Sequence, residues 1–254
     1  MSTTNDLPPT ERCLGVLGGM GPQATVDFLA KLVQVTPVQR EQDHLHVLVD
    51  SNPKVADRNL ALAGQGPSPA PQLVAMAQRL ERAGAQLLVM ACNTAHAFER
   101  EIRAAVAVPF VGIVDEAADA CARLGARQVG LLAAPGCLAA GLYQRALAQR
   151  GMAPVLLAPP EQAAFDALLY RIKLGEPRAA LSPAMQALAH GLIARGADTV
   201  LAACTEVPLV LSQAEVERAL IDATHNLAER CVLYARGQLS LPLTSSERPT
   251  LSSS

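Results

Sequence analysis

The stretch GAQLLVMACNT, residues 84–94, matches GADTVLAACTE, residues 196–206, without a gap. Each begins with Gly-Ala, continues through a short apolar run and ends with a cysteine between small or polar residues. A second pair, GVLGGMGP at 15–22 and GLLAAPGC at 130–137, precedes the first pair at nearly the same offset. Two copies of a similar unit therefore follow each other along the chain.

Short runs rich in Val, Leu and Ile alternate with Ala-rich segments of helical period. This alternation is typical of a parallel sheet that helices bury on both faces. Together with the repeat, it predicts an α/β fold of two similar lobes, each a mainly parallel sheet flanked by helices. The predicted strands are 13–17, 45–49, 87–90, 110–112, 129–132, 154–157 and 199–202, and the predicted helices include 23–35, 72–83 and 99–107.

The predicted lobes divide the chain after residue 112. Residues 1–112 form the first lobe, which a C-terminal helix at 210–237 completes, and residues 113–209 form the second. The Gly and Pro content of 64–71 predicts a loop. The polar segment 238–254 has no periodicity and is predicted to be a flexible tail.

Composition excludes several function classes. Of the 254 residues, 50% are hydrophobic and 17% are charged, which is enough to bury a full core. A formal net charge of -2, without a run of Lys or Arg, argues against nucleic acid as a partner. Neither a membrane-spanning stretch nor a secretion signal is recognisable, so we expect a cytoplasmic protein that does not bind membranes.

The six cysteines are scattered, without a CxxC pair, which predicts free thiols rather than disulfides or a zinc ribbon. His44 and His46 form an HxH pair beside a predicted strand, but no third ligand is recognisable. We therefore expect no metal.

Two cysteines fall where an α/β fold places its chemistry. Ligands of open parallel sheets bind beyond the carboxyl ends of the strands, and Cys92 and Cys204 each follow a predicted strand. A helix start after each cysteine is expected to lower the pKa of its thiol. In a pseudo-symmetric pair of lobes, the two thiols face one another across the cleft. Opposed thiols suit the inversion of an acidic carbon, because one removes a proton while the other delivers one to the opposite face.

A partial dinucleotide-binding pattern leaves an NAD-binding oxidoreductase as an alternative. GMGPQA at 19–24 fits GxGxxA, and Asp50 ends the next strand, where an acid would bind ribose hydroxyls. Pro22 replaces a residue that usually closes this turn, however, and the alternative gives the repeated cysteines no role. Two opposed thiols explain more of the sequence.

GGMGP at 18–22, DSNPKVADR at 50–58, MACNTAH at 90–96 and CTEVPL at 204–209 occur in this order. They resemble the motifs of the aspartate/glutamate racemase family, and the resemblance runs from about residue 13 to residue 237. It implies a fold of two pseudo-symmetric lobes with the active site in the cleft between them. The implied reaction is racemisation of a free dicarboxylic amino acid, most closely aspartate, by two catalytic cysteines. It also implies that no PLP or other cofactor is used, and it allows a homodimer.

The resemblance assigns roles where this sequence matches the motifs. Cys92 and Cys204 fall on the two acid/base positions. The positions that hold or line the substrate are Met20, Asn52, Arg58, Asn93, Thr94, Lys173 and Thr205. Arg58 and Lys173 match basic residues that receive carboxylates, although Arg58 could instead pair with Asp50 or Asp57. His96 and Glu206 lie beside the catalytic motifs and are candidates for tuning the thiols.

One stretch departs from the family pattern. Relatives usually have ATxGT where this chain has AAPGC, so Ala134 and Cys137 replace threonines. This loss of hydroxyl groups leaves the choice between aspartate, glutamate and a broader set of substrates open. Isomerases and decarboxylases of the same superfamily are alternatives, but a decarboxylase needs one protonating cysteine and a cis–trans isomerase uses one as nucleophile. A symmetric pair of cysteines favours racemisation.

Overall fold

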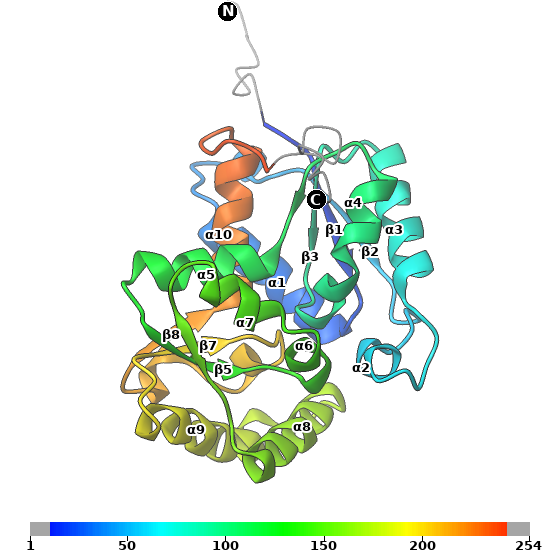
Figure 1. The fold of residues 1–254 in the computed structure, drawn as a ribbon. Helices are drawn as coiled ribbons and strands as arrows, with labels where there is room; N and C mark the ends of the chain where they lie inside the picture. Colours follow the sequence, from blue (N-terminus) through cyan, green and yellow to red (C-terminus); the bar gives the residue numbers. More distant parts are fainter. Residues whose placement is uncertain (1–10, 243–254) are drawn as a thin grey trace, which may run out of the picture.

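The computed structural model describes residues 11–242, which form two four-stranded parallel sheets flanked by helices (Figure 1). The first sheet has the order β2-β1-β3-β4, with β1 (Leu14–Gly18), β2 (Val47–Ser51), β3 (Leu87–Met90) and β4 (Phe110–Val111). The second has the order β6-β5-β7-β8, with β5 (Gln128–Leu132), β6 (Ala153–Val155), β7 (Thr199–Ala202) and β8 (Ala219–Asp222). The predicted α/β class is confirmed.

The two sheets have equivalent strand orders, as the sequence repeat predicts. In each sheet the third strand in chain order, β3 or β7, lies in the interior of the sheet and all four of its residues are buried. β3 is apolar throughout and β7 is apolar except for Thr199, which suits parallel strands covered on both faces. The two repeated cysteines follow these two strands.

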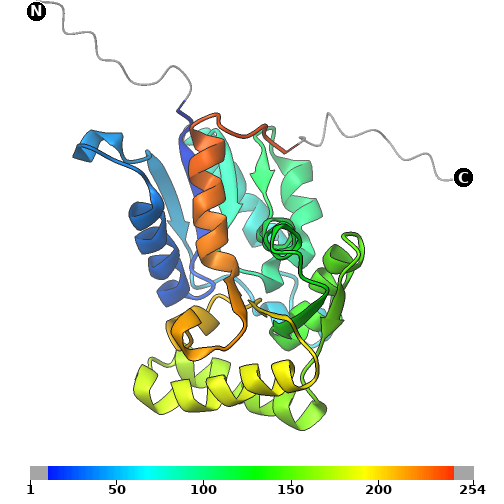
Figure 2. The same ribbon diagram turned by 90° about the vertical axis from the view of Figure 1, so that its left-hand side faces the viewer.

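Helices cover the sheets and fill the space between them. The first half of the chain contains α1 (Pro22–Val35), η1 (Glu41–Asp43), α2 (Arg58–Leu62), α3 (Ala70–Arg82), η2 (Thr94–Phe98) and α4 (Glu99–Ala105). Beyond residue 112 follow α5 (Ile113–Arg123), α6 (Pro135–Ala139), α7 (Leu142–Ala148), α8 (Pro159–Lys173), α9 (Arg178–Ala194), η3 (Val207–Leu209), η4 (Gln213–Glu215) and α10 (Ala223–Ala235). Figure 2 shows α10 beside α1, with α8 and α9 at the opposite end of the molecule.

Helix α1 begins at the carboxyl end of β1, directly after the turn GGM. Pro22 occupies the first turn, where its missing N–H costs nothing and its fixed φ suits a helix. Ala24, Phe28 and Leu32 recur every four residues and bury one face of α1. The first free N–H groups of α1 therefore lie at the sheet edge where ligands of parallel sheets bind.

One apolar core joins the two sheets. Its largest cluster contains Leu14 and Val89 from the first sheet and Val129 and Leu201 from the second, together with residues of α5 and α10. Two smaller clusters lie on the outer faces of the sheets, and Cys92 belongs to the first-sheet cluster and Cys204 to the second-sheet cluster. All six cysteines are free and buried.

The predicted C-terminal helix at 210–237 is wrong in its first half. Ala219–Asp222 forms β8 and pairs with β7, so the second sheet continues beyond residue 209. The helix begins only at Ala223, because the Asp222 carboxylate accepts hydrogen bonds from the N–H groups of Thr224 and His225. α10 then packs on α1 and α5. The boundaries of the two lobes otherwise stay a prediction.

Other boundaries differ by a few residues. The predicted loop at 64–71 ends earlier, since α3 begins at Ala70 with a proline in its first turn. Strands β1 and β2 begin one and two residues later than predicted. Of the predicted tail, residues 243–254 lie outside the described residues. Within residues 11–242, no helix combines the length and apolar character that crossing a membrane requires.

Candidate active site

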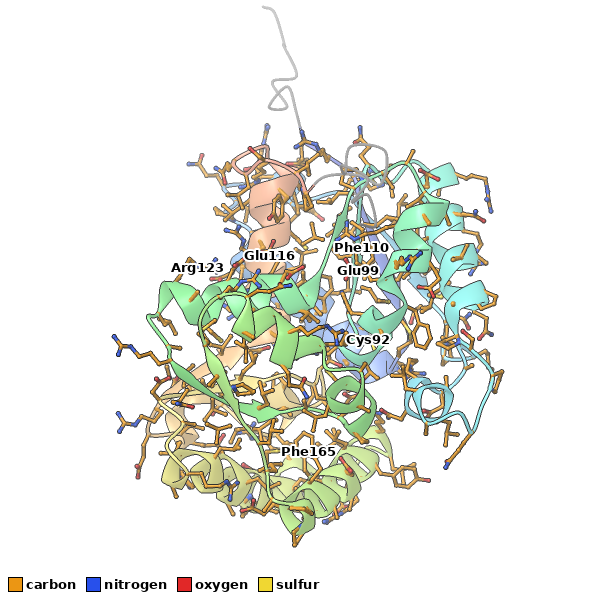
Figure 3. The ribbon with its side chains drawn as sticks, viewed as in Figure 1. Cys92, Glu99, Phe110, Glu116, Arg123 and Phe165 are labelled. Carbon is orange, nitrogen blue, oxygen red and sulfur yellow. The ribbon has the colours of Figure 1, made fainter. Side chains whose placement is uncertain are left out.

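Cys92 and Cys204 occupy equivalent places in the two sheets. Each lies two residues beyond the end of its strand, β3 or β7, and each is about 5% exposed. In Figure 3, Cys92 lies where the part of the chain that carries the first sheet meets the part that carries the second. Both thiols are therefore largely shielded from water at the carboxyl ends of equivalent strands.

Two hydrogen bonds to backbone groups fix the imidazole ring of His96 next to Cys92. Its Nε2 accepts a hydrogen bond from the N–H of Ile113 at 3.1 Å, so Nδ1 carries the proton and donates to the carbonyl oxygen of Cys92 at 2.8 Å. Burial lowers the pKa of His96 and keeps the ring neutral. Since both ring nitrogens bind backbone groups, His96 is placed to hold the Cys92 backbone rather than to exchange protons with the thiol.

Cys204 is held as a protonated thiol. Its Sγ donates to Glu206 Oε2 at 2.9 Å, and the hydroxyl of Thr205 donates to the same oxygen at 3.2 Å. Burial and the negative charge of Glu206 raise the pKa of Cys204 well above its usual value. The predicted lowering of this pKa is therefore wrong. The chain after Cys204 forms only the three-residue turn η3, which carries too little dipole to outweigh burial.

Glu206 also connects Cys204 to Lys173. Lys173 Nζ lies 3.9 Å from Glu206 Oε1, an oxygen that is buried without a hydrogen-bond partner among the described residues. Burial disfavours the charge on Lys173, but Glu206, Cys204 and Cys92 together outweigh it and raise the pKa of Lys173. Lys173 thus lies within electrostatic range of both predicted catalytic cysteines and stays an ammonium ion.

Arg58 is the first residue of α2 and keeps part of its guanidinium unpaired. Its Nη1 donates to the carbonyl oxygens of Val55 and Ala56 at 3.3 and 3.2 Å. Its Nε is buried and has no partner within residues 11–242. The alternative pairing with acids does not form, since Asp50 binds Arg79 and Asp57 caps α2.

A cavity of about 200 Å³ brings these groups together. Arg58, Lys173 and Glu206 line it from α2, α8 and the segment after β7. The other lining residues come mainly from the turn between β1 and α1 and from neighbouring apolar positions: Gly19, Gly21, Pro22, Gln23, Ala24, Pro53, Ile172 and Leu209. Two cations and a helix N-terminus favour carboxylates, and the Glu206 carboxylate can accept from an ammonium group.

A larger cavity of about 640 Å³ lies between α4 and α7. His96 lines this larger cavity, whereas Arg58 and Lys173 do not, and neither Cys92 nor Cys204 lines either of the two cavities. We place the candidate site at the smaller cavity because the charged residues that the sequence predicts converge there. Among residues 11–242, no three His, Cys, Asp or Glu side chains are grouped so as to hold a metal ion.

The other predicted binding residues lie around the two strand ends. Met20 is buried in the same apolar cluster as Cys92, and Thr94 begins the turn η2 and is also buried. The Asn52 side chain accepts from the N–H of Lys54 and thus stabilises its own turn. Its backbone packs against Gly19, which has a φ of +87°; a Cβ at Gly19 would lie 2.4 Å from the Asn52 backbone, so no side chain fits there.

Two residues that contact the candidate site were not predicted from the sequence. Tyr143 of α7 donates its hydroxyl to Asn93 Oδ1 at 2.5 Å, and Asn59 of α2 accepts the N–H of Gly136 at 3.0 Å. Both bonds join the first half of the chain to the segment after β5. Neither residue lies in a motif or at a strand end, so only the three-dimensional packing identifies them.

Comparison with known proteins identifies the family of the chain. The Asp/Glu/Hydantoin racemase family profile matches residues 17–231. The structure resembles the Picrophilus torridus aspartate racemase, with a TM-score of 0.81, 26% identity, and coverage of 93% of this chain and 97% of that chain. The broad specificity amino-acid racemase RacX of Bacillus subtilis (strain 168) is 28% identical over 225 residues, which are 86% of this chain and 96% of RacX. A glutamate racemase of Roseiflexus sp. (strain RS-1) is 34% identical over 157 residues, 58% of this chain and 55% of that protein. The family profile covers most of the chain, which therefore belongs to the Asp/Glu/hydantoin racemase family and is an amino-acid racemase.

Proposed function

We propose that this racemase interconverts L- and D-aspartate without a cofactor, by proton transfer between Cys92 and Cys204. The observation that carries the proposal is the pair of buried thiols at equivalent strand ends, both within electrostatic range of Lys173, which lines the small cavity together with Arg58. Two cations match the two carboxylates of aspartate, and an amino acid with an uncharged side chain would leave one cation unpaired.

In one direction, the thiolate of Cys92 removes the α-proton of the substrate, and the electron pair of the C–H bond remains on the α-carbon. The Cys204 thiol then delivers its proton to the opposite face, which forms the new C–H bond and leaves a Cys204 thiolate. The protonated state of Cys204, bound to Glu206, suits the acid in this direction. The reverse direction exchanges the two roles.

Nearby charges support this transfer. The Lys173 ammonium ion favours each thiolate as it forms, since its own pKa is raised by the charges of Cys204 and Cys92. Asn93, Thr94 and Thr205 would hold the α-carboxylate and α-amino groups, the role that the family resemblance assigns to them. Met20 and Asn52 would line the pocket, and Glu206 would tune the Cys204 thiol that it binds.

The substrate range is the finer part of the proposal. In the stretch AAPGC, Ala134 caps α6 without a side-chain hydrogen bond and Cys137 is buried, so neither offers the hydroxyl of a threonine. Similarity to RacX, named a broad specificity racemase, and to a glutamate racemase makes glutamate or a wider set the second candidate. We favour aspartate because both cations lie at one small cavity of about 200 Å³.

Circular dichroism of L-aspartate and L-glutamate solutions, each incubated with dialysed enzyme, tests the proposal. We expect the aspartate signal to decay to zero without added PLP or metal, and faster than that of glutamate. Alkylation of the thiols should abolish the decay, and excess aspartate should protect against alkylation. A strict need for PLP, or full activity after alkylation of both cysteines, would overturn the mechanism. Faster decay with another amino acid would overturn the substrate.

A further inference from the structure

We propose that Tyr143 is a positioning residue that orients the side-chain amide of Asn93 toward the α-carboxylate of the substrate. The inference rests on the proposed role of Asn93 in holding that carboxylate. Tyr143 lies on α7, in the half of the chain that carries the second sheet, whereas Asn93 follows β3 of the first sheet. The hydrogen bond from the Tyr143 hydroxyl to Asn93 Oδ1, 2.5 Å long, therefore connects the two halves beside Cys92.

An amide has one acceptor side and one donor side, so fixing one side fixes the other. The Tyr143 hydroxyl must donate to Oδ1, because a carbonyl oxygen cannot donate. The ring is fully buried, and burial raises the pKa of the Tyr143 hydroxyl, which keeps it protonated and able to donate. Asn93 consequently turns its Nδ2 away from Tyr143.

The Nδ2 of Asn93 is buried and has no hydrogen-bond partner within residues 11–242. Buried amide groups normally find partners, so this donor marks a place where an acceptor is expected. A carboxylate offers acceptors only and therefore suits it. If the amide were turned over, Oδ1 would face the substrate carboxylate and repel it.

The segment that carries Tyr143 is itself anchored to the first half of the chain. The N–H of Gly136 donates to Asn59 Oδ1 at 3.0 Å, and a Cβ at Gly136 would lie 2.6 Å from that oxygen and 3.0 Å from the methyl group of Thr94. Tyr143 shares its apolar cluster with Cys137 of the same segment. The two contacts between the halves thus place Tyr143 relative to Asn93 and its neighbour Thr94.

Replacing Tyr143 by Phe keeps the ring and removes only the hydroxyl. Free rotation of the Asn93 amide should raise the KM for the amino acid about tenfold, the equivalent of about 1.4 kcal/mol, with kcat changed much less. The matched control is Tyr234→Phe, which removes a 2.6 Å hydrogen bond to the buried Glu116 at α5. This control should leave KM unchanged.

The effect of Tyr143→Phe should disappear when Asn93 is already Ala, because Tyr143 acts through that amide. Should Tyr143→Phe fail to fold, Asn93→Asp provides the test, since it keeps an acceptor for Tyr143 but turns a second oxygen toward the substrate. A rise in KM of at least about tenfold is then expected. An unchanged KM in the folded Tyr143→Phe protein, an unchanged KM in Asn93→Asp, or an equal effect of Tyr143→Phe without the Asn93 amide overturns the inference.

The assay separates this inference from the substrate proposal. The α-carboxylate is common to all amino acids, so the variants are measured with whichever amino acid the wild-type enzyme racemises fastest. Failure of the wild-type enzyme on aspartate would overturn the aspartate proposal alone. Failure of Tyr143→Phe to raise KM for the preferred substrate would overturn the positioning role alone.

Discussion

Replacing Arg58 by Ala should impair the turnover of aspartate far more than that of an amino acid with an uncharged side chain. Arg58 lines the small cavity and has a buried Nε without a partner in the described chain, so part of its guanidinium is available to a substrate carboxylate. Arg offers planar, paired donors that match a carboxylate, which Ala cannot replace.

The expected size of the effect follows from the contacts that remain. A hydrogen bond between charged groups contributes about 1.5–3 kcal/mol, which corresponds to roughly a 10- to 150-fold loss in kcat/KM for aspartate. In the Arg58→Ala variant, Lys173 still lines the cavity and supplies one positive charge. The loss in kcat/KM should therefore be smaller than for a substrate carboxylate buried without any cation. An uncharged substrate has no such bond and should lose less than about threefold.

The structure supplies a control for the loop that Arg58 supports. Gln72 holds the same loop by donating to the carbonyl of Lys54 and accepting from the N–H of Ala56, but it does not line the cavity. Gln72→Ala should therefore slow both substrates equally. Polarimetric kcat/KM values for both substrates and both variants measure this. Equal losses for the two substrates in Arg58→Ala, or an aspartate-selective loss in Gln72→Ala, would refute a direct role of Arg58.

Three further predictions concern the thiols and their neighbours. Cys92→Ser and Cys204→Ser should each slow racemisation roughly 10²- to 10⁴-fold, measured by polarimetry from either enantiomer, whereas replacing the buried Cys231 by Ser should leave the rate near that of wild type. A normal rate in either of the first two variants would refute the two-thiol mechanism. Glu206→Gln removes a charge that raises the pKa of Cys204, so the pH at which that thiol is alkylated at half its maximal rate should fall. An unchanged midpoint pH would show that burial alone raises the pKa of Cys204. His96 has a folded-state pKa below its usual 6.5, so the unfolded chain binds the proton first and the free energy of unfolding should decrease as pH falls below about 6.5. Each pKa unit by which folding lowers the pKa of His96 corresponds to about 1.4 kcal/mol. In urea unfolding at pH 7.5 and pH 5, the free energy of unfolding should decrease less for His96→Asn than for wild type. An equal decrease in the two proteins would contradict this account.

The parallel sheets were predictable because an interior strand, buried on both faces, can be recognised from its own short apolar sequence. Residues 87–90 are all apolar and residues 199–202 are apolar except for Thr199; both runs lie between helical segments, and the predicted bounds match β3 and β7. β8 was not predictable in this way. Its four residues ALID lie within a segment of helical period, and what makes them a strand is pairing with β7, a tertiary contact. The repeat itself carried the signal, since β4 takes the equivalent place in the first sheet.

The candidate site was predictable where its residues follow a strand or match a family motif, as Arg58 and Lys173 do. Cys92 and Cys204 could be found from strand ends, and Glu206 from its position two residues after a cysteine. The protonated state of Cys204 depends on burial and on the direction of the Glu206 carboxylate, which residue order does not specify. Tyr143 lies 50 residues from Asn93 and meets it only because α7 packs beside the end of β3.

The two halves of the site are equivalent in backbone but not in chemistry, and this difference bears on how the enzyme treats two mirror-image substrates. Cys92 is followed directly by Asn93, which accepts a hydrogen bond from Tyr143, whereas Cys204 is followed by Thr205 and then by Glu206, which accepts a hydrogen bond from the Cys204 thiol. A proton on Cys204 is therefore stabilised by Glu206, and a thiolate there forms against the same negative charge unless Lys173 offsets it. In the proposed mechanism, the direction in which Cys204 is the acid starts from a thiol that Glu206 already holds. The opposite direction needs a Cys204 thiolate, which forms against the charge of Glu206 and therefore depends more on Lys173.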